Sequence, residues 1–391
     1  MMKILSISTF ALALLSVNDV SAAISGWTQK ADFGSHGRHR GVGIAIGNKG
    51  YMGMGHYNGA GPNIVLKDWW EYDPANGTWT QKTDYIGNGG NGTYAPLTFG
   101  MDNLGFIGGG QVATSNDFFK YDPATNAWTQ VADSPTFSEN FKAFAIGNKG
   151  YYLDGSQVFE YNADTDTWTT KNNAPFSGGI WNSTFVIDGK GYIKTGASLW
   201  EYKATTDQWA SRASYPGLAS RGSVGFAQNN KGYIVCGYGI GLSDVQSETW
   251  EFDPALNQWT YLLDFPGTKR RFCSGFNIGN RAYLGIGTNG TNFNDFWEFN
   301  ADEAFASLSE NVNDFHFLAY PNPAADQIRI DSEALKQFDI NIYNLTGRLV
   351  ATTSTKNGSA LLSRDNLSNG AYLYQVVHDH AIIHQERIIF N

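Results

Sequence analysis

Short runs of alternating apolar and polar residues fill about the first 300 residues of the chain, and turns rich in Gly and Asn separate them. One unit reads "GVGIAI", then the turn "GNKG", then "YMGMG", which is typical of a β-hairpin. A second hairpin follows around an Asp-Pro turn, as in "WWEYDPANGTW" (69–79). The pattern therefore predicts units of four antiparallel strands, called A to D from here on.

This four-stranded unit recurs. In five copies an aromatic residue stands nine positions before a tryptophan, and these tryptophans are Trp79, Trp128, Trp168, Trp209 and Trp259. A turn that ends in an aromatic residue marks strand B of six copies, at Tyr51, Phe106, Tyr151, Tyr192, Tyr233 and Tyr283. Four-stranded units that repeat every 40 to 50 residues or so are typical of a β-propeller. We expect the aromatic residues to fill the space between neighbouring sheets.

The sixth copy begins at Trp297 and has no tryptophan nine positions later. The N-terminal sequence "GWTQK" offers Trp27 in the same "WTQK" context as Trp79. We therefore expect the N-terminal strand to be the outer strand of the sixth sheet. The predicted fold class is all-β, with a six-bladed propeller closed by the N-terminal strand and a small C-terminal β-sandwich.

The repeat resembles the kelch repeat, in which strand B ends in glycines, strand C carries an aromatic residue and strand D carries a tryptophan. The resemblance covers about residues 26 to 306 and implies a kelch-type propeller. The glycines that should end strand B are complete only in the second copy, at 108–110, so no subfamily is assigned.

Composition agrees with an all-β protein, because 45 glycines and 15% aromatic residues suit tight turns between aromatic-rich strands. The net charge of -9 argues against a nucleic-acid partner, since binding to phosphates depends on a basic surface. The two cysteines, Cys236 and Cys273, are compatible with one disulfide or with two buried thiols.

The N-terminal residues 1–22 have the layout of a secretory signal peptide, with Lys3, an apolar run and "VSA" before the cleavage point. A membrane anchor is the alternative, but the run is too short to span a bilayer. The predicted domains are the signal peptide (1–22), the propeller (23–306), a linker (307–319) and a C-terminal domain (320–391). No transmembrane segment is expected in the mature chain.

The C-terminal segment resembles the C-terminal sorting domain of the bacterial type IX secretion system. The residues that match its pattern, in order, are Pro321, Asn322, Pro323, Gly347, Leu367, Gly370 and Tyr372. The resemblance implies export in two steps, the outer-membrane secretion machinery as a partner, and a final place on the cell surface or in the medium. An unrelated accessory β-module is the alternative.

The B–C and D–A loops vary in length and should emerge on one face of the propeller, opposite the nearly constant A–B and C–D turns. Variable loops on a rigid scaffold are where binding sites usually lie. The longest B–C loops belong to copies 1, 5 and 6, which a closed six-bladed ring makes neighbours. One position in the D–A loops, twelve residues before the strand-B aromatic, holds His39, Tyr94, Glu139, Ile180, Arg221 and Arg271 in turn.

The basic residues of this set predict a site for a carboxylate or another anion, which an arginine can hold with two parallel hydrogen bonds. Aromatic residues near the same loops are expected to stack on sugar or peptide groups. The predicted ligand-binding residues are His39, Arg221, Arg271, Arg38, Tyr57, Tyr94, Trp181 and Tyr238, with Arg40, Lys269 and Arg270 close by in sequence. The alternative is that the arginines cap backbone carbonyls inside the ring.

No motif predicts catalysis, a metal or a cofactor. His36, His39 and His56 lack a recognised ligand spacing, and the kelch-like copper oxidases are not matched residue by residue. The fold is similar to that of N-acetylneuraminate epimerase, and Glu139 opposite His39, Arg221 and Arg271 is the one candidate for proton transfer to a sugar acid. The predicted function is a non-catalytic, exported module that binds a carbohydrate or a protein. The alternatives are a secreted sugar-acid epimerase or mutarotase and a purely structural adhesion module.

Overall fold

The computed structural model describes residues 26–58, 63–101, 103–136, 143–177, 181–304, 317–344, 349–365, 367–378 and 381–391. The predicted signal peptide, Glu139, Ile180 and Gly347 lie outside these ranges. Within them, regular structure is almost all strand, apart from the 3-10 helix η1 (Asn88–Gly90) and a short helix at 301–304. None of the described helices is long and apolar enough to cross a membrane.

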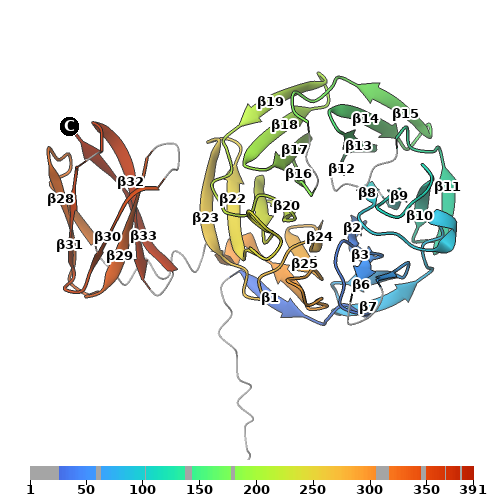
Figure 1. Cartoon of the computed structure of the whole chain (residues 1–391), viewed down its shortest axis with the longest axis horizontal. Coiled ribbons are helices and arrows are strands. Elements are labelled where there is room, and N and C mark those ends of the chain that lie inside the picture. The colour runs from blue at the N-terminus through green and yellow to red at the C-terminus, as the bar shows by residue number, and fades with distance from the viewer. Residues whose placement is uncertain are drawn as a thin grey trace, which may run out of the picture.

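Six four-stranded antiparallel sheets make up residues 27–299 (Figure 1). Sheets 1 to 3, from inner to outer strand, are β2 (Val42–Ile46), β3 (Lys49–Gly53), β6 (Trp69–Asp73), β7 (Thr78–Lys82); β8 (Leu97–Met101), β9 (Leu104–Gly108), β10 (Phe118–Asp122), β11 (Ala127–Val131); and β12 (Ala143–Ile146), β13 (Lys149–Asp154), β14 (Gln157–Asn162), β15 (Thr167–Lys171). The short strands β4 (His56–Tyr57) and β5 (Ile64–Val65) pair within the first B–C loop.

Sheets 4 to 6 follow the same plan. They are β16 (Ser183–Ile187), β17 (Lys190–Thr195), β18 (Ser198–Lys203), β19 (Gln208–Arg212); β20 (Val224–Gln228), β21 (Lys231–Val235), β22 (Glu248–Asp253), β23 (Gln258–Asp264); and β24 (Ser274–Ile278), β25 (Arg281–Gly285), β26 (Phe296–Phe299), β1 (Trp27–Lys30). In sheet 6 the N-terminal strand β1 is the outer strand, and Trp27 pairs with Phe299 of β26. The buried Trp27 ring also contacts Phe265 of the preceding loop, with centroids 5.0 Å apart.

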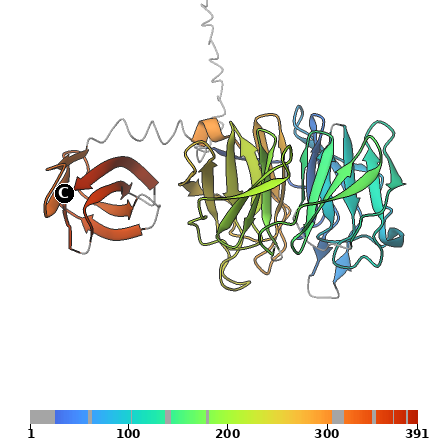
Figure 2. The same cartoon turned by 90° about the horizontal axis from the view of Figure 1, so that it is seen from above.

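The sheets stand around a common axis in a propeller-like arrangement, with the inner strands running along that axis and outer strands such as β7 and β19 lying around the circumference (Figures 1 and 2). Each inner strand contacts the inner strands of the sheets before and after it, and β24 contacts β2. Alternation along each inner strand produces this packing. In β2, Val42, Ile44 and Ile46 are buried between sheets, whereas Gly43 and Ala45 are partly exposed. Small residues also let the strands approach, since a β-carbon at Gly100 would lie 2.2 Å from the carbonyl oxygen of Ala45.

The Asp-Pro turns interlock neighbouring sheets. The Trp128 indole donates a 3.0 Å hydrogen bond to the carbonyl of Thr83 in the previous sheet. The side chain of Asn126, in the turn before that tryptophan, accepts one from the Thr83 amide at 3.0 Å. Asn126 has φ of 51°, a left-handed conformation that Asn adopts more readily than most residues. Asp166, Asp207 and Asn257 hold the same turn position in the next three sheets. Each of these side chains accepts a hydrogen bond from a backbone amide that follows the outer strand of the preceding sheet.

The connections between strands form two rims. The turn rim consists of the A–B and C–D turns: 47–48, 74–77, 103, 123–126, 147–148, 163–166, 188–189, 204–207, 229–230, 254–257 and 279–280. The loop rim consists of the described B–C and D–A loops: 31–41, 54–58, 63–68, 83–96, 109–117, 132–136, 155–156, 172–177, 181–182, 196–197, 213–223, 236–247, 265–273 and 286–295. As predicted, the longest B–C loops belong to sheets 1, 5 and 6, whose inner strands β20, β24 and β2 contact one another in turn.

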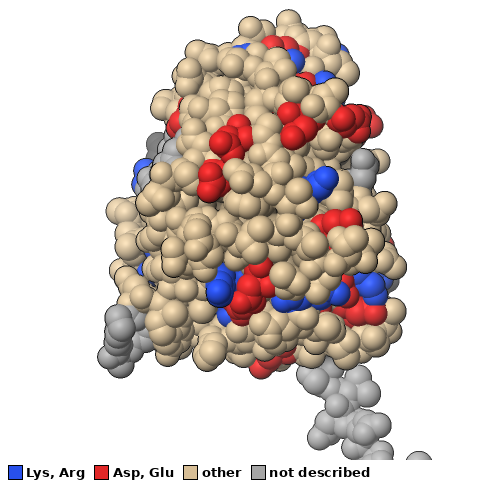
Figure 3. Space-filling view, turned by 90° about the vertical axis from the view of Figure 1, so that its right-hand side faces the viewer, with Lys and Arg blue, Asp and Glu red and all other residues tan. Residues whose placement is uncertain are grey.

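The outer wall carries paired charges. Glu160 of β14 forms ion pairs with Lys149 at 2.6 Å and with Lys171 at 3.5 Å, and both lysines lie in the same sheet. On the side of the molecule drawn in Figure 3, acidic and basic side chains are interspersed among uncharged ones. The wall therefore offers no continuous basic surface on that side.

The C-terminal domain consists of two sheets that enclose one hydrophobic core. One has three strands, β27 (Phe317–Tyr320), β28 (Gln327–Ser332) and β31 (Ser359–Ser363). The other has four, β29 (Phe338–Asn344), β30 (Leu349–Thr355), β32 (Gly370–His378) and β33 (Ala381–Phe390). Phe317, Leu318 and Ala319, which the sequence analysis placed in the linker 307–319, pair with β28 as part of β27.

Candidate functional site

Four predicted site residues, His39, Trp181, Tyr238 and Arg271, meet at the loop rim. They surround Phe272, which was not predicted to belong to the site. Its ring lies 4.8 Å from the Trp181 ring and 5.5 Å from the Tyr238 ring, between centroids. The His39 ring stacks on it at 5.9 Å, and the Arg271 guanidinium lies 5.5 Å from its centroid. Loops of sheets 1, 4, 5 and 6 thus converge on a single aromatic centre.

Arg40, the residue after His39 in the loop of sheet 1, completes this centre. Its guanidinium lies 4.5 Å from the centroid of Phe272 and 4.7 Å from that of Trp181. Arg40, Trp181 and Phe272 hold the same place, two residues before an inner strand, and all three have positive φ, of 56°, 65° and 58°. Cation–π contacts of this kind contribute about 0.5 to 2 kcal/mol each, depending on burial. We call these three residues the roof.

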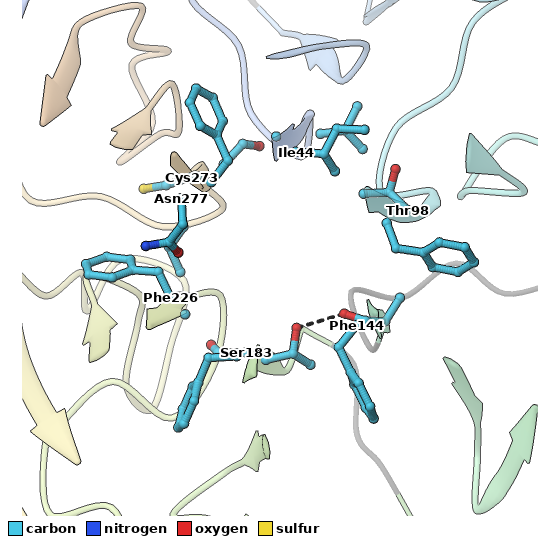
Figure 4. Close-up of a pocket in the computed structure, with 18 of the residues that line it drawn as sticks. Ile44, Thr98, Phe144, Ser183, Phe226, Cys273 and Asn277 are labelled. Carbon is cyan, nitrogen blue, oxygen red and sulfur yellow. Dashed lines mark hydrogen bonds between the residues drawn. The ribbon is translucent and has the colours of Figure 1, made fainter. Parts of the chain in front are cut away.

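A cavity of about 430 Å³ lies among the inner strands (Figure 4). Trp181 and Phe272 of the roof belong to its lining, as do Ile44, Thr98 and Asn277. None of the lining residues that the structure describes is charged. Several polar groups there are already bonded within the protein, for example Asn277, whose amide donates to the carbonyl of Ala227 at 2.7 Å. Arg40 of the roof and the neighbouring Arg271 thus lie beside a cavity whose described lining is neutral.

Two buried histidines lie next to the roof. The His39 and His56 rings are 4.0 Å apart, and His56 stacks on Tyr94 at 4.4 Å, which brings this further predicted residue into the site. Burial, followed by the charges of His56 and Arg40, lowers the pKa of His39 to about 3. Burial and then Arg40 lower the pKa of His56 to about 4. Both imidazoles are therefore neutral at pH 7.

Hydrogen bonds leave part of each imidazole free. His39 Nε2 lies 3.0 Å from the side-chain oxygen of Asn58, and Arg40 donates to His56 Nε2 at 3.4 Å. Among the described residues, the Nδ1 atoms of both rings are buried and have no hydrogen-bond partner. A buried polar atom without a partner is costly, so these atoms mark a place where a ligand or water is accommodated.

The arginines of the site carry charge that no described acidic group balances. Burial lowers the pKa of Arg40 and of Arg271, and the neighbouring groups that act on these two pKa values are other cations and tyrosines. In the described part of the chain, Arg271 Nε and Nη1 and Arg40 Nε have no hydrogen-bond partner. Guanidinium N–H groups in this state are suited to an anion. We call Arg40, His39, His56, Arg271 and Phe272 the rim site.

Arg38, which the sequence predicts to bind a ligand, has its partners within the protein. Its side chain is fully buried, and it forms an ion pair with both carboxylate oxygens of Asp68. It also donates to the carbonyl of Met54 at 3.1 Å. Arg270 is held in the same way by Asp295 and the carbonyl of Ile286. Both arginines therefore stabilise the loops, as the alternative of capped carbonyls anticipated, whereas their sequence neighbours face the rim site.

The remaining predicted residues lie at the edge of the rim site or outside it. Arg221 is exposed on the loop rim, and its backbone pairs with that of Tyr238. Tyr57 is half-buried and lies 6.2 Å from the exposed His36, between ring centroids. Glu139 is outside the described residues. Within the described ranges, no group of three or more His, Cys, Asp or Glu side chains is arranged to hold a metal ion.

The two cysteines are free, buried thiols in neighbouring sheets. Cys273 lines the cavity and is hydrogen-bonded to Cys236. Burial raises the pKa of the Cys236 thiol, which keeps it protonated and unreactive. The sequence left open whether these residues pair in a disulfide, and in this structure they do not.

Phe272, Arg40 and His56 were not among the predicted ligand-binding residues. Phe272 and Arg40 stand one position after Arg271 and His39, so the same repeat alignment, read one residue further on, marks both. His56 carries no such signal, because it reaches the site through the antiparallel bridge that it forms with His39.

The predicted sorting residues lie in the C-terminal domain. Pro321, Asn322 and Pro323 connect β27 to β28, and the Asn322 side chain bonds to the backbone of Arg387 and Ile389 in β33, at 3.0 and 2.9 Å. Gly370 begins β32, and the buried Tyr372 donates to the carbonyl of Ser368 at 2.9 Å. Gly347 is not described. The motif residues thus hold one edge of the domain together.

Residues 318–391 match the family model of the secretion system C-terminal sorting domain. The C-terminal domain is a type IX sorting domain. Its presence implies an exported protein with a cell-surface or extracellular destination and an interaction with the secretion machinery. No curated protein matches the chain.

The propeller-like region is similar to the solved structure of YjhT. The two share 14% sequence identity and a TM-score of 0.59, and the alignment covers 68% of this chain and 95% of YjhT. At this level of identity the similarity concerns the fold alone, and it supports a propeller-like arrangement of the sheets.

Proposed function

We propose that this protein is an exported, six-bladed kelch-type propeller, closed by its N-terminal strand, that binds an anionic ligand at the rim site. Six four-stranded sheets, the chain of contacts between inner strands and the pairing of β1 with β26 support the architecture. The sorting domain supports export. The proposed domains are those predicted from the sequence, with the linker ending before β27.

The observation that carries the binding proposal is the state of Arg271. Two of its guanidinium nitrogens are buried and have no partner among the described residues, and they lie beside a second arginine and two neutral histidines. Burying unpaired charge is costly, and an arriving carboxylate would remove that cost by accepting two parallel hydrogen bonds. Tyr94 and Tyr238 border the same site, where the Tyr94 ring stacks on His56 and the buried Tyr238 ring packs against Phe272.

Binding fits this site better than proton transfer does. An epimerase acting on a sugar acid needs an acid–base group beside the anion clamp. The described residues place two histidines there, whose lowered pKa values make them poor bases near neutral pH. The carboxylate of that hypothesis, Glu139, is not described. We therefore propose a non-catalytic role.

A binding experiment tests this function. The secreted chain is screened against carboxylated glycans, their neutral counterparts and acidic peptides, and the affinity for the best ligand is measured by calorimetry. Arg271→Gln should weaken binding at least about tenfold, because it removes a charged hydrogen-bond donor from the site. The matched control is Arg281→Gln, on the opposite side of sheet 6, where the arginine pairs with Glu298 at 3.6 Å. Equal affinities of the two variants for every ligand found would overturn the proposal.

A further inference from the structure

Three large aliphatic side chains project from two loops of sheet 5 on the loop rim. Leu218 is 66% exposed, Ile240 is 104% exposed and Leu242 is 51% exposed. Such exposure is unusual for residues that normally contribute to a core, and contiguous apolar patches often mark contact surfaces. We call Leu218, Ile240 and Leu242 the sheet 5 tip.

The loop that carries this tip is held in a defined shape. The backbone carbonyl of Asp244 accepts a hydrogen bond from the amide of Gly239 at 2.9 Å. The side-chain carboxylate of Asp244 accepts another from the amide of Ile240 at 3.2 Å. Gln246 donates to the other carboxylate oxygen at 2.7 Å. These bonds use backbone atoms and the Asp244 side chain, so the Ile240 and Leu242 side chains contribute little to the fold. The hydrogen bonds of the loop therefore keep the Ile240 and Leu242 side chains exposed.

The sheet 5 tip is continuous with the rim site. Tyr238, whose ring contacts Phe272 at 5.5 Å, stands two residues before Ile240 in the same loop. Two residues span about 7 Å at most in an extended chain. Arg221 is exposed next to this segment, because its backbone pairs with Tyr238. A ligand whose anionic group lies at Arg271 can therefore reach the tip within a few residues of its own length.

We propose that the rim site and the sheet 5 tip together bind a segment of a partner protein in which a carboxylate is followed closely by aliphatic side chains. This inference rests on the proposed function and assigns the ligand to protein rather than carbohydrate. Unpaired N–H groups on Arg271 complement the carboxylate. Aliphatic side chains are not the groups that recognise sugars, which bind through stacking on aromatic rings and through hydrogen bonds, whereas they match an apolar pocket or strip on a protein.

Local charge favours a protein over a membrane surface. The carboxylates of Asp244 and Glu248 accept hydrogen bonds from the amides of the tip residues Ile240 and Leu218, at 3.2 and 2.8 Å, and Arg221 is the exposed cation whose backbone pairs with this loop in the described structure. A loop that inserts into an anionic bilayer normally carries an excess of lysine and arginine beside its apolar residues. The sheet 5 tip has no such excess among the described residues.

A peptide-display selection tests the inference. The full secreted chain is immobilised and screened against a library of random linear 12-residue peptides. The selected sequences should combine Asp or Glu with Leu, Ile or Val a few positions away. The best peptide is then synthesised, and its dissociation constant is measured for the wild type and for three variants. The double variant Ile240→Ser/Leu242→Ser and the single variant Arg271→Gln should each weaken binding about tenfold or more.

The matched control is Leu256→Ser, because Leu256 is 66% exposed but lies on the turn rim, and this change should leave the dissociation constant unaltered. Selection of no sequence, or of peptides that bind the Ile240→Ser/Leu242→Ser variant as well as the wild type, would overturn the inference. Binding of anionic phospholipid vesicles that this variant loses would also overturn it, in favour of a membrane.

The same variants separate this inference from the proposed function. If carboxylated glycans or peptides depend on Arg271 but not on the sheet 5 tip, the rim site binds anions and only the assignment to a protein segment fails. If no anionic probe depends on Arg271, both proposals fail.

Discussion

The two rims of the propeller-like region are built from the same strands but leave their polar and apolar groups in different states. On the turn rim, side chains such as Asn126 and Asn257 bond to the backbone of Thr83 and Ala213, the residues that directly follow the outer strand of the preceding sheet. On the loop rim, two histidines and two arginines have buried nitrogen atoms that no described residue pairs with. Of the six exposed large hydrophobic residues described in this region, five lie on the loop rim: Ile64, Ile86, Leu218, Ile240 and Leu242. The sixth, Leu256, is on the turn rim.

This difference indicates that one rim holds the sheets together and the other is available for recognition. The division is sharpest between two adjacent residues. Arg270 is fully buried and paired with Asp295, whereas Arg271 is half-buried and its Nε and Nη1 atoms have no partner in the described part of the chain. Residues of the same type, next to each other in sequence, can therefore have opposite roles. The following changes are expected to break or sharpen this contrast, from the largest effect to the smallest.

Trp27→Ala should lower the free energy of unfolding by about 3 to 5 kcal/mol, because a fully buried indole leaves a cavity where β1 joins sheet 6. Chemical denaturation measures the loss. Amide hydrogen exchange should show the largest loss of protection in β24 to β26. Trp27→Phe, which keeps an aromatic ring against Phe265 and Phe299, should retain most of the stability. An unchanged denaturation midpoint for Trp27→Ala would contradict a structural role for the N-terminal strand.

Arg270→Met should cost about 3 kcal/mol, since it leaves the Asp295 carboxylate without its partner in a largely buried place. The neighbouring change Arg271→Gln should not lower stability, because it removes a partly buried charge whose Nε and Nη1 atoms have no hydrogen-bond partner among the described residues. Urea denaturation of the two variants under one set of conditions provides the comparison. Similar losses in both would show that the two arginines do not differ as the structure indicates.

Lowering the pH should weaken the fold through His39 and His56. Their folded-state pKa values, about 3 and about 4, lie below the ordinary value of 6.5, so the unfolded chain binds more protons between these limits. Stability is therefore full above about pH 6.5 and falls as the pH falls, by up to about 1.4 kcal/mol per pH unit for each histidine.

The pH effect is measured as the slope of unfolding free energy between pH 6.5 and 5, where most carboxyl groups remain ionised. His39→Gln/His56→Gln should flatten this slope, whereas His36→Gln, at an exposed position, should leave it as it is. An equal slope in all three proteins would exclude the buried imidazoles as its cause.

Asn257→Gly should cost about 1 kcal/mol, the usual contribution of one hydrogen bond, here the 2.9 Å bond from the Ala213 amide. Glycine is the matched replacement because Asn257 has φ of 53°, and sheet 1 already has Gly77 in this turn position with φ of 69°. Asn257→Ala should cost about 1 kcal/mol more, since alanine is strained there. Thermal denaturation of both variants resolves the two contributions.

Much of the fold could be predicted from the sequence, because its causes are local. Alternating residues fix which side of each strand is buried, and the Asp-Pro and Gly-Asn turns fix where each hairpin reverses. The regular interval between aromatic residues and tryptophans indicated the repeated sheets. Pairing of Trp27 with Phe299 across the length of the region was predictable only because Trp27 shares its local context with Trp79.

The rim site was predicted in part. Alignment of the repeats brought His39, Tyr94, Arg271 and their aromatic neighbours to one rim, but it could not distinguish Arg38 from Arg40. Those two residues differ only in the direction in which a loop turns them, and Asp68, which binds Arg38, lies 30 positions away. Nothing in the local sequence indicates that Asp68 and Asp295 form ion pairs with Arg38 and Arg270. It also does not indicate that they form no ion pair with Arg40 or Arg271.

The sequence by itself therefore determined the strands, the repeated sheets and the sorting domain, since each follows from a short-range pattern of apolar residues, turns and motif residues. Only the tertiary structure decided which charges are balanced and which are free. Burial and ion pairing depend on the distance between atoms from different sheets, and that distance exists only once the sheets have assembled around their axis.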